Sequence, residues 1–283
     1  MFSNRLLSNN LVSNRLVSNN LVSNNLISNI LFFGFYIERL FPNLTKIDLR
    51  HNMLKDLRFL RNFKKLKLKD INLSENNIEI IEIEFNGTNL IQNLEVLNLS
   101  NNKIYYIYGL IKLINLTYLN LSRNRILKIE GLDTLTRLQY LDLSNSRLNF
   151  NRNRITKIEG LNTLTRLQHL DLSNNQITKI EGLNGLINLK TLNLRDNRIT
   201  KIKGLNELKN LEYLILRHNQ IEIIEGLNEL KILKSLVLSN NQIEKIEGLN
   251  KLENLSFFNL SENPVINWEV LNNFNLKILR IIK

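Results

Sequence analysis

The chain of 283 residues carries 38 Lys and Arg against 26 Asp and Glu, a formal net charge of +12, and contains no cysteine. Disulfide bonds are thereby excluded, which fits a reducing compartment. The longest apolar run, residues 30–37, has eight residues, whereas a membrane-spanning helix needs roughly 20.

Residues 1–29 form a low-complexity segment with a period of five residues, as in Asn-Leu-Val-Ser-Asn. Ser and Asn interrupt it throughout, so it lacks the apolar core of a signal peptide, and we expect a soluble intracellular protein of the cytoplasm or nucleus. The segment is either one coil of a pentapeptide-repeat β-helix or a flexible expansion. We favour the expansion, because a lone coil cannot bury its apolar face.

Residues 30–43 carry bulky apolar side chains directly before the first clear repeat. The first coil of a stacked array exposes its core unless something covers it. We therefore predict that this segment is an N-terminal cap.

Residues 44–263 hold about ten copies of Leu-x-x-Leu-x-Leu-x-x-Asn-x-Ile-x-x-Ile-x-Gly-Leu-x-x-Leu, cleanest at residues 167–186. The asparagines of successive copies are mostly 22 residues apart. A sustained period of this length predicts a solenoid in which each coil packs only on its neighbours. The asparagine position is occupied by Asn52, Asn76, Asn102, Asn124, Asn153, Asn175, Asn197, Asn219, Asn241 and Asn263.

An insertion of seven residues, 146–152, lengthens the interval between Asn124 and Asn153 to 29 residues. Residues 131–145 are nearly repeated as residues 160–174, which indicates a duplication. The asparagine position is filled either by Ser146 or by Asn153, and both assignments stay open. The surplus residues are either a contact loop or a remnant of the duplication, and we favour the remnant.

Within each unit, Leu-x-Leu places two leucines on one face of a short strand, so Leu170 and Leu172 should point inward. The asparagine, Asn175 in this coil, can bond to backbone groups that the turn would otherwise bury unpaired. A recurring glycine, such as Gly182, indicates a positive φ or a close approach between coils. We predict a structural asparagine ladder at Asn102, Asn124, Asn175, Asn197, Asn219, Asn241 and Asn263.

The phrase Ile-x-x-Ile-Glu-Gly-Leu stands at residues 155–161, 177–183 and 243–249. Together with Leu-x-Leu-Ser-x-Asn, it resembles the 22-residue class of leucine-rich repeats, whose best-known member is the leucine-rich-repeat regulatory subunit of protein phosphatase 1. The resemblance covers about residues 38–283 and includes residues 264–283, which resemble a shortened C-terminal cap. It implies an α/β horseshoe with a parallel sheet on its concave face and short 3-10, helical or extended convex segments.

Two columns of side chains should run along the concave face, because equivalent residues of successive strands stack. The second column, Asp or Asn between the leucines, follows from the repeat consensus. The first column contains aromatic residues that the consensus does not explain, and exposed aromatics are typical of interface hot spots. We predict that the partner-binding residues are Tyr118, Tyr140, Asp142, His169, Asp171, Tyr213 and Phe257.

His169, Asp171 and Ser173 alternate along one strand, about 6–7 Å between successive residues, whereas a catalytic triad needs contacts near ~3 Å. A metal at Asp142, His169 and Asp171 would lack a cysteine or a second histidine as a further ligand. No phosphate-binding glycine loop is present. We predict a non-enzymatic protein with no catalytic residue, no metal site and no cofactor.

We interpret the chain as a monomeric scaffold for a protein partner, and the resemblance makes a catalytic subunit of the protein phosphatase 1 type the sharper hypothesis. Three other functions stay open: an adhesin like the bacterial internalins, a basic nucleic-acid-associated protein, and a repeat expansion without a partner. Residues 55–69 carry seven basic residues against Asp56, and such charge attracts phosphates. No nucleic-acid-binding motif accompanies it, so we expect no nucleic-acid partner.

Overall fold

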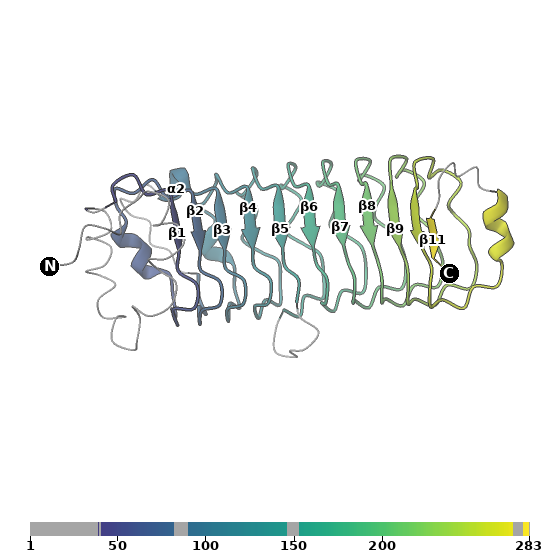
Figure 1. Ribbon diagram of the computed structural model, residues 1–283, viewed down its shortest axis with the longest axis horizontal. Coiled ribbons are helices and arrows are strands. Elements are labelled where there is room, and N and C mark those ends of the chain that lie inside the picture. The colour runs from purple at the N-terminus through teal and green to yellow at the C-terminus, as the bar shows by residue number, and fades with distance from the viewer. Residues whose placement is uncertain (1–38, 40, 82–89, 146–152, 274–279, 283) are drawn as a thin grey trace, which may run out of the picture.

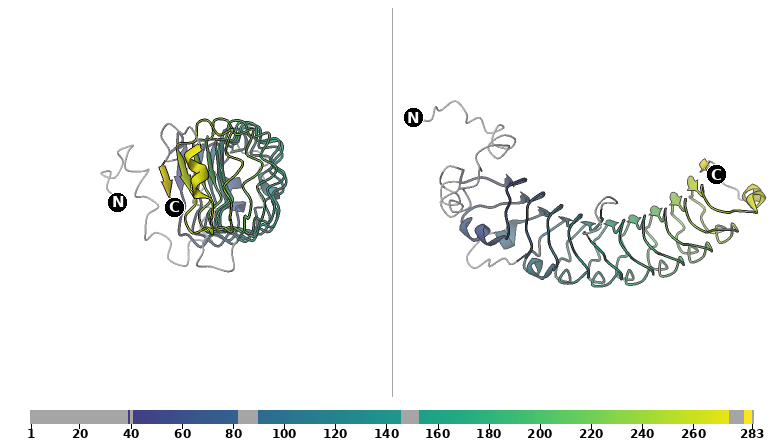
Figure 2. Two further views of the ribbon diagram at one scale, coloured as in Figure 1. Left: turned by 90° about the vertical axis from the view of Figure 1, so that its right-hand side faces the viewer. Right: turned by 90° about the horizontal axis from the view of Figure 1, so that it is seen from below.

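The computed structural model describes residues 39, 41–81, 90–145, 153–273 and 280–282, which form one curved solenoid (Figure 1). In this part of the chain, eleven three-residue strands make one parallel sheet in chain order. The sheet lies on the inner side of the arc and the return segments lie on the outer side (Figure 2). The predicted horseshoe is therefore confirmed. The strands are β1 Lys46–Asp48, β2 Asp70–Asn72, β3 Val96–Asn98, β4 Tyr118–Asn120, β5 Tyr140–Asp142, β6 His169–Asp171, β7 Thr191–Asn193, β8 Tyr213–Ile215, β9 Ser235–Val237, β10 Phe257–Asn259 and β11 Arg280–Ile282.

Neighbouring strands pair without a register shift, so equivalent residues stand side by side. Tyr118 pairs with Tyr140, Tyr140 with His169, and Asp142 with Asp171. The middle residue of each strand from β1 to β10 is buried and the two outer residues are not. Both predicted concave columns are confirmed, because the hydrophobic alternation fixes which face of each strand is buried and so determines which residues meet.

Helical segments are short. The described ones are η1 Arg58–Asn62, α2 Leu90–Asn93, η2 Tyr108–Leu110 and η3 Trp268–Asn273. The other return segments are turns, held by bonds such as Leu186 N–H to the Leu183 carbonyl at 2.9 Å. From β4 to β10, β-branched isoleucines and a glycine in each return segment disfavour a longer helix. Within the described residues, no helix is long and apolar enough to cross a membrane.

The core is a continuous stack of leucine and isoleucine from one end of the solenoid to the other. In the best repeat, Leu170, Leu172, Ile177 and Ile180 are all buried, none exposed by more than 4%. Full burial of such a side chain contributes about 1.5–3 kcal/mol. Each coil leaves its two flat sides apolar, so burial is complete only when a neighbouring coil covers them.

The asparagine ladder is confirmed. The Asn175 Nδ2 donates to the carbonyls of Leu143 in the preceding coil, at 3.1 Å, and of Leu172 in its own, at 3.0 Å. Its Oδ1 accepts from the backbone N–H of Ile155 at 3.1 Å. The same contacts recur at each predicted rung, and the donor distances to the preceding coil span 2.8 to 3.1 Å. One side chain thus satisfies backbone groups of two coils inside an apolar core.

Asn153, not Ser146, occupies the asparagine position that follows the insertion. Its Nδ2 donates to the carbonyls of Leu121 at 3.2 Å and Leu143 at 3.1 Å, and its Oδ1 accepts from the Ile126 N–H at 2.9 Å. Residues 146–152 lie outside the described residues, and the same holds for the 1–29 segment and nearly all of the 30–43 cap.

Two backbone positions that recur along the solenoid adopt a left-handed conformation. The glycine is one of them: Gly182 has a φ of 72°, and a Cβ there would lie 2.1 Å from the Ile158 carbonyl oxygen. Positive φ and close approach, offered as alternatives by the sequence, therefore both hold. The residue before the ladder asparagine is the other, and it is not glycine: Arg123 has a φ of 56° and Asn174 of 57°.

At the C-terminal end the sheet continues one strand further than the sequence analysis predicts. β11 pairs with β10, with Phe258 opposite Ile281, inside the segment assigned to a cap. Asn267 also has a capping role: its Oδ1 accepts from the Ile246 N–H at 2.8 Å and its Nδ2 donates to the Ile246 carbonyl at 3.3 Å. No repeat pattern marks either feature, because the motif has already ended.

Candidate functional site

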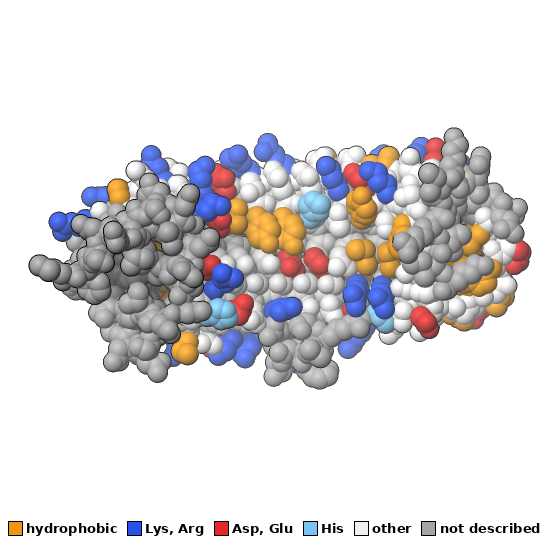
Figure 3. Space-filling view, viewed as in Figure 1, with side chains coloured by type: hydrophobic (Ala, Val, Ile, Leu, Met, Phe, Trp, Pro, Cys, Tyr) orange, Lys and Arg blue, Asp and Glu red, His pale blue; other side chains and the backbone are white. Residues whose placement is uncertain are grey.

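The concave face of β4, β5 and β6 carries a contiguous aromatic patch. The rings of Tyr118 and Tyr140 are stacked, with centroids 4.4 Å apart and an interplanar angle of 6°. The His169 ring lies beside them, 6.2 Å from the Tyr140 centroid and tilted by 41°. Zero register shift between three strands produces this row directly. Figure 3 shows a hydrophobic surface at the middle of the sheet, next to a histidine and two acidic side chains.

The acidic pair of the patch is Asp142 and Asp171, which are paired across β5 and β6. Asp142 Oδ1 accepts from the Ser144 N–H at 2.9 Å, and Asp171 Oδ1 accepts from the Ser173 N–H at 2.8 Å. Burial raises the pKa of Asp142, against the lowering effect of its bonds from Ser144, and the Asp171 charge raises it further. Burial, followed by the Asp142 charge, also raises the pKa of the Tyr140 hydroxyl. The patch is thus apolar and carries negative charge at its edge.

Tyr213 and Phe257 do not join this patch. Thr191 separates Tyr213 from His169, and Ser235 separates Tyr213 from Phe257. The Tyr213 side chain is 43% exposed. The seven predicted binding residues therefore fall into a tyrosine–histidine–aspartate patch on β4 to β6 and separate aromatic residues on β8 and β10.

Two apolar residues near Tyr213 were missed by the sequence analysis. Ile215 on β8 and Val237 on β9 stand opposite each other in the second concave column, where most coils have Asn or Asp. Both are partly exposed. The signal in the sequence is that two consecutive coils have an apolar residue where the consensus has Asp or Asn. It was overlooked because the whole column was attributed to the consensus.

No catalytic constellation forms at His169. Ser173, which the strand alternation placed on the concave side with His169 and Asp171, is only 6% exposed. Its position follows the end of β6, where the alternation no longer applies. Among the described residues, no group of three His, Cys, Asp or Glu side chains converges as metal ligands would.

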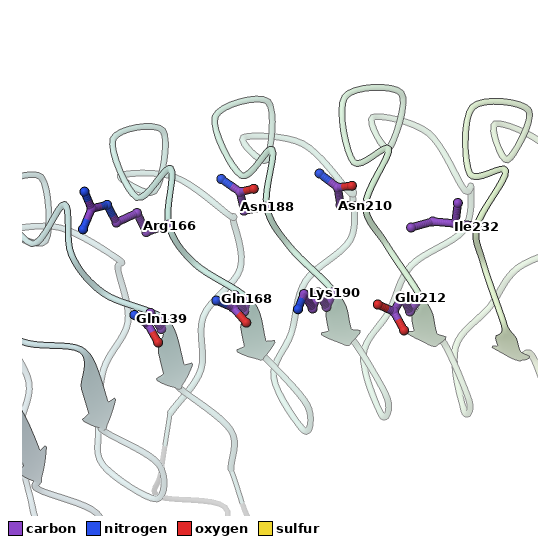
Figure 4. A pocket seen from close by; sticks show the side chains of 8 residues that line it. All are labelled: Gln139, Arg166, Gln168, Asn188, Lys190, Asn210, Glu212 and Ile232. Atoms are coloured by element: carbon purple, nitrogen blue, oxygen red, sulfur yellow. The ribbon is translucent and has the colours of Figure 1, made fainter.

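A shallow groove of about 350 Å³ runs along the N-terminal ends of strands β5 to β8 (Figure 4). Glu212 in it accepts from the Lys234 Nζ at 2.6 Å, and this bond lowers the pKa of Glu212. Asn188 and Asn210 form a second ladder through bonds of 2.8 Å to the carbonyls of Thr165 and Ile187. The groove offers amide and charged side chains. It is lined by Gln139, Arg166, Gln168, Asn188, Lys190, Asn210, Glu212 and Ile232.

Three exposed tyrosines, Tyr105, Tyr106 and Tyr108, lie outside the sheet. Tyr106 and Tyr108 are stacked with centroids 5.6 Å apart. The Arg125 Nη1 donates to the Tyr105 hydroxyl at 2.6 Å, and the guanidinium lies 5.4 Å from that ring's centroid. These tyrosines were not among the predicted binding residues, although three tyrosines within four residues are a signal visible in the sequence.

The family model described as Leucine Rich repeats (2 copies) matches residues 92–134, 146–185 and 187–229. These matches lie within the central coils of the solenoid. No curated protein matches the chain.

Several solved structures are similar to the chain. Internalin C2 of Listeria monocytogenes is 28% identical with a TM-score of 0.57, over 67% of this chain and 78% of the internalin chain. The TLR13 structure, a complex with ssRNA13, is 26% identical with a TM-score of 0.69, over 80% of this chain but only 34% of the TLR13 chain. InlJ of Listeria monocytogenes, whose functional domain includes a cysteine ladder, shares the fold at 22% identity and a TM-score of 0.59, over 84% of this chain and 53% of the InlJ chain.

Proposed function

Because the chain is a leucine-rich-repeat protein, we propose that it is a non-enzymatic scaffold that holds one protein partner on its concave face. Stacked repeats create an extended concave surface, and solenoids of many kinds use that surface for binding. The described part of this chain has such a surface along ten strands, with side chains arranged in continuous columns.

The single observation that carries this proposal is the stacked pair Tyr118 and Tyr140 beside His169. Binding energy in protein interfaces concentrates on a few aromatic and arginine anchors near the centre. The two rings are already held against each other, so binding costs little side-chain entropy. Asp142 and Asp171 at the patch edge favour a partner that brings a cationic side chain next to an apolar one.

A narrower form of the proposal names a catalytic subunit of the protein phosphatase 1 type as the partner. Its support is the resemblance of residues 155–161 and their copies to the repeat class of that phosphatase's regulatory subunit. Repeat class alone is weak support for one partner. Direct titration of this chain with the purified catalytic subunit tests it, and the absence of binding would remove this partner while leaving the general proposal in place.

An internalin-like adhesin is the second candidate, supported by the similarity to internalin C2 and InlJ. The composition favours a location inside the cell instead, because no cysteine is present. Fractionation of source cells with an antibody to this chain separates the two.

A nucleic-acid-associated role has support from the +12 net charge and from the similarity to TLR13. Steep salt dependence of binding to random-sequence RNA would favour it.

The decisive experiment is affinity capture from source-cell lysate followed by mass spectrometry. Wild type is compared with a Tyr118→Ala, Tyr140→Ala variant. The matched control is Tyr105→Ala, Tyr106→Ala, which removes two exposed tyrosines outside the sheet. We expect a partner that wild type and control retain and the concave variant loses, while all three give the same circular dichroism. Equal capture by all three proteins contradicts the assignment of binding to this patch.

A further inference from the structure

The second concave column is interrupted at β8 and β9. From β1 to β7, and again at β10, this column holds only Asp or Asn, whereas β8 and β9 have Ile215 and Val237. The two are opposite each other, and Tyr213, 43% exposed, is on the same strand as Ile215. Figure 3 shows hydrophobic side chains with Lys or Arg beside them on this part of the face. Two adjacent coils therefore present an apolar strip in place of hydrogen-bonding groups.

The polar residue of this column has a specific role in other coils: it accepts hydrogen bonds from the residue two positions later. Asn120 Oδ1 accepts from the Ser122 hydroxyl at 2.7 Å and from its N–H at 2.9 Å. In the same way, Asn72 Oδ1 accepts from the Ser74 hydroxyl and Asn259 Oδ1 accepts from the Ser261 hydroxyl.

Where the later residue is arginine, the acceptor can be a carboxylate. Arg50 Nε donates to the two Asp48 oxygens at 3.2 and 3.0 Å. The chain therefore contains its own example of an arginine in this position with a carboxylate partner.

At β8 and β9 the acceptor is missing and the donors remain. In the part of the chain that the structure describes, two buried side-chain polar atoms lack a hydrogen-bond partner: Arg217 Nε and Ser239 Oγ. They follow Ile215 and Val237 by two positions. Ser239 is 2% exposed. Arg217 and Ser239 lie in adjacent coils. The Leu216 N–H donates to the Val237 carbonyl at 2.8 Å, and the His218 N–H donates to the Ser239 carbonyl at 2.9 Å.

We propose that this site accepts an acidic side chain of an extended peptide segment of the protein partner. The carboxylate of a partner Asp or Glu acts as the missing acceptor, as the Asp48 carboxylate does for Arg50, and receives hydrogen bonds from Arg217 and Ser239. An apolar residue next to it in the partner packs on Ile215, Val237 and Tyr213. This inference rests on the proposed function, which it deepens by naming the chemistry of one contact.

A carboxylate fits better than the phosphates of a nucleic acid for two reasons. The strip beside Arg217 is apolar and suits a peptide side chain, whereas a polynucleotide running along the sheet would also cross the charges of Asp142 and Asp171. The adjacent Arg195 already donates through its Nε to Asp196 at 2.8 Å. Arg217, by contrast, takes part in no ion pair within the described residues.

The test uses the immobilised full chain and two pools of short peptides, acetylated and amidated at their ends. One pool has a central Asp or Glu between bulky apolar residues, and the other has Asn or Gln there. We expect wild type to enrich the acidic pool about tenfold, because a charge-assisted bond is markedly stronger than a neutral one. Arg217→Gln should abolish the preference.

Ile215→Asp should abolish it as well, because it supplies inside the chain the acceptor that the partner would bring and restores the repeat consensus. Asn120→Asp is the matched control: it adds the same charge in the same column on β4 and should leave the preference intact. Each variant is compared with wild type by circular dichroism and thermal unfolding.

Persistence of the preference in Arg217→Gln or Ile215→Asp overturns the inference, and so does a wild type without any preference. Tighter binding of a uridine oligonucleotide that is lost in Arg217→Gln also overturns it, in favour of a phosphate ligand. The proposed function is tested separately, by the affinity capture that compares wild type with the Tyr118→Ala, Tyr140→Ala variant. Retained capture without a carboxylate preference defeats this inference alone.

Discussion

The rings of Tyr118 and Tyr140 lie parallel, 4.4 Å apart, because β4 and β5 pair with no register shift and carry the same residue at the same position. Offset-stacked aromatic pairs contribute about 0.5–1.5 kcal/mol beyond their burial. A double-mutant cycle with Tyr118→Ala and Tyr140→Ala, measured by denaturant unfolding, should return a coupling energy in that range.

Tyr118 and Tyr213 provide the reference pair for this cycle, since four strand steps separate β4 from β8. Their substitutions should be additive within about 0.3–0.5 kcal/mol. Additivity in the stacked pair as well would show that the rings do not interact in solution.

The two asparagine ladders should differ sharply in their contribution to stability. Asn175→Ala leaves the Ile155 N–H unpaired inside the core, whereas the Leu143 carbonyl keeps its second donor, the Asn153 amide. An unsatisfied buried group costs about 1–3 kcal/mol, so we expect a loss in that range in the free energy of unfolding.

The comparison is Asn188→Ala, which removes one bond at an exposed position. Water replaces the lost partner there, and the loss should be below about 1 kcal/mol. Equal losses in urea titrations of the two variants would contradict the structural role assigned to the buried ladder.

Asp142→Asn should stabilise the protein at neutral pH. Burial raises the pKa of Asp142 in the folded state above its ordinary value of 3.8. The folded protein therefore holds this proton more tightly than the unfolded chain. The stabilisation of the fold by the protonated Asp142 carboxyl is fully present below the ordinary pKa of the group and is lost as pH rises through its raised pKa.

The advantage of Asp142→Asn should accordingly disappear below the ordinary pKa. Asn is compatible with the position, since Asn120 makes the equivalent bond to Ser122. Unfolding of wild type and variant is compared at neutral pH and at about pH 3. Asp133→Asn, which removes an exposed carboxylate, controls for net charge, and an equal gain from it would refute the burial argument.

Arg123→Asn should stabilise the chain by up to about 1 kcal/mol. Arg123 has a φ of 56°, and the left-handed conformation costs an ordinary L-residue about 1–2 kcal/mol, whereas Asn adopts it more readily. Asn101, Asn174 and Asn240 occupy the same position in other coils with φ of 55° to 57°.

Thermal unfolding measures the gain. Arg166→Asn makes the same chemical change at a residue without a positive φ and should not stabilise. A gain that is equal at both sites would assign the effect to charge instead of backbone conformation.

Much of the fold could be predicted because most repeats have the same length. A period of 22 residues and a two-residue alternation are sufficient to pair Tyr118 with Tyr140 and to place Leu170 in the core. The insertion at residues 146–152 left two assignments, because Ser146 and Asn153 both satisfy the pattern. Hydrogen bonds from the Asn153 amide to Leu121 and Leu143 decide between them.

Features that depend on a departure from the pattern were harder to predict. Ile215 and Val237 belong to a column that reads as consensus, and their effect is visible only through the unpaired donors of Arg217 and Ser239. β11 lies beyond the last motif, so no periodicity marks it. The separation of Tyr213 from the Tyr118 patch follows from Thr191, which lies between His169 and Tyr213 in the predicted column, but the prediction grouped the aromatics by residue type.

Constant strand pairing also makes distance along the concave face a discrete quantity. Adjacent strands are about 4.8 Å apart, and the tyrosine patch on β5 is three strand steps from Ile215 on β8. A gain or loss of one whole repeat between them, by a duplication such as the near-copy of residues 131–145 at 160–174 indicates, changes that span by one step and alters neither patch. The solenoid is in this sense a molecular ruler, on which whole-repeat duplication changes the spacing between two contacts while the chemistry of each is conserved.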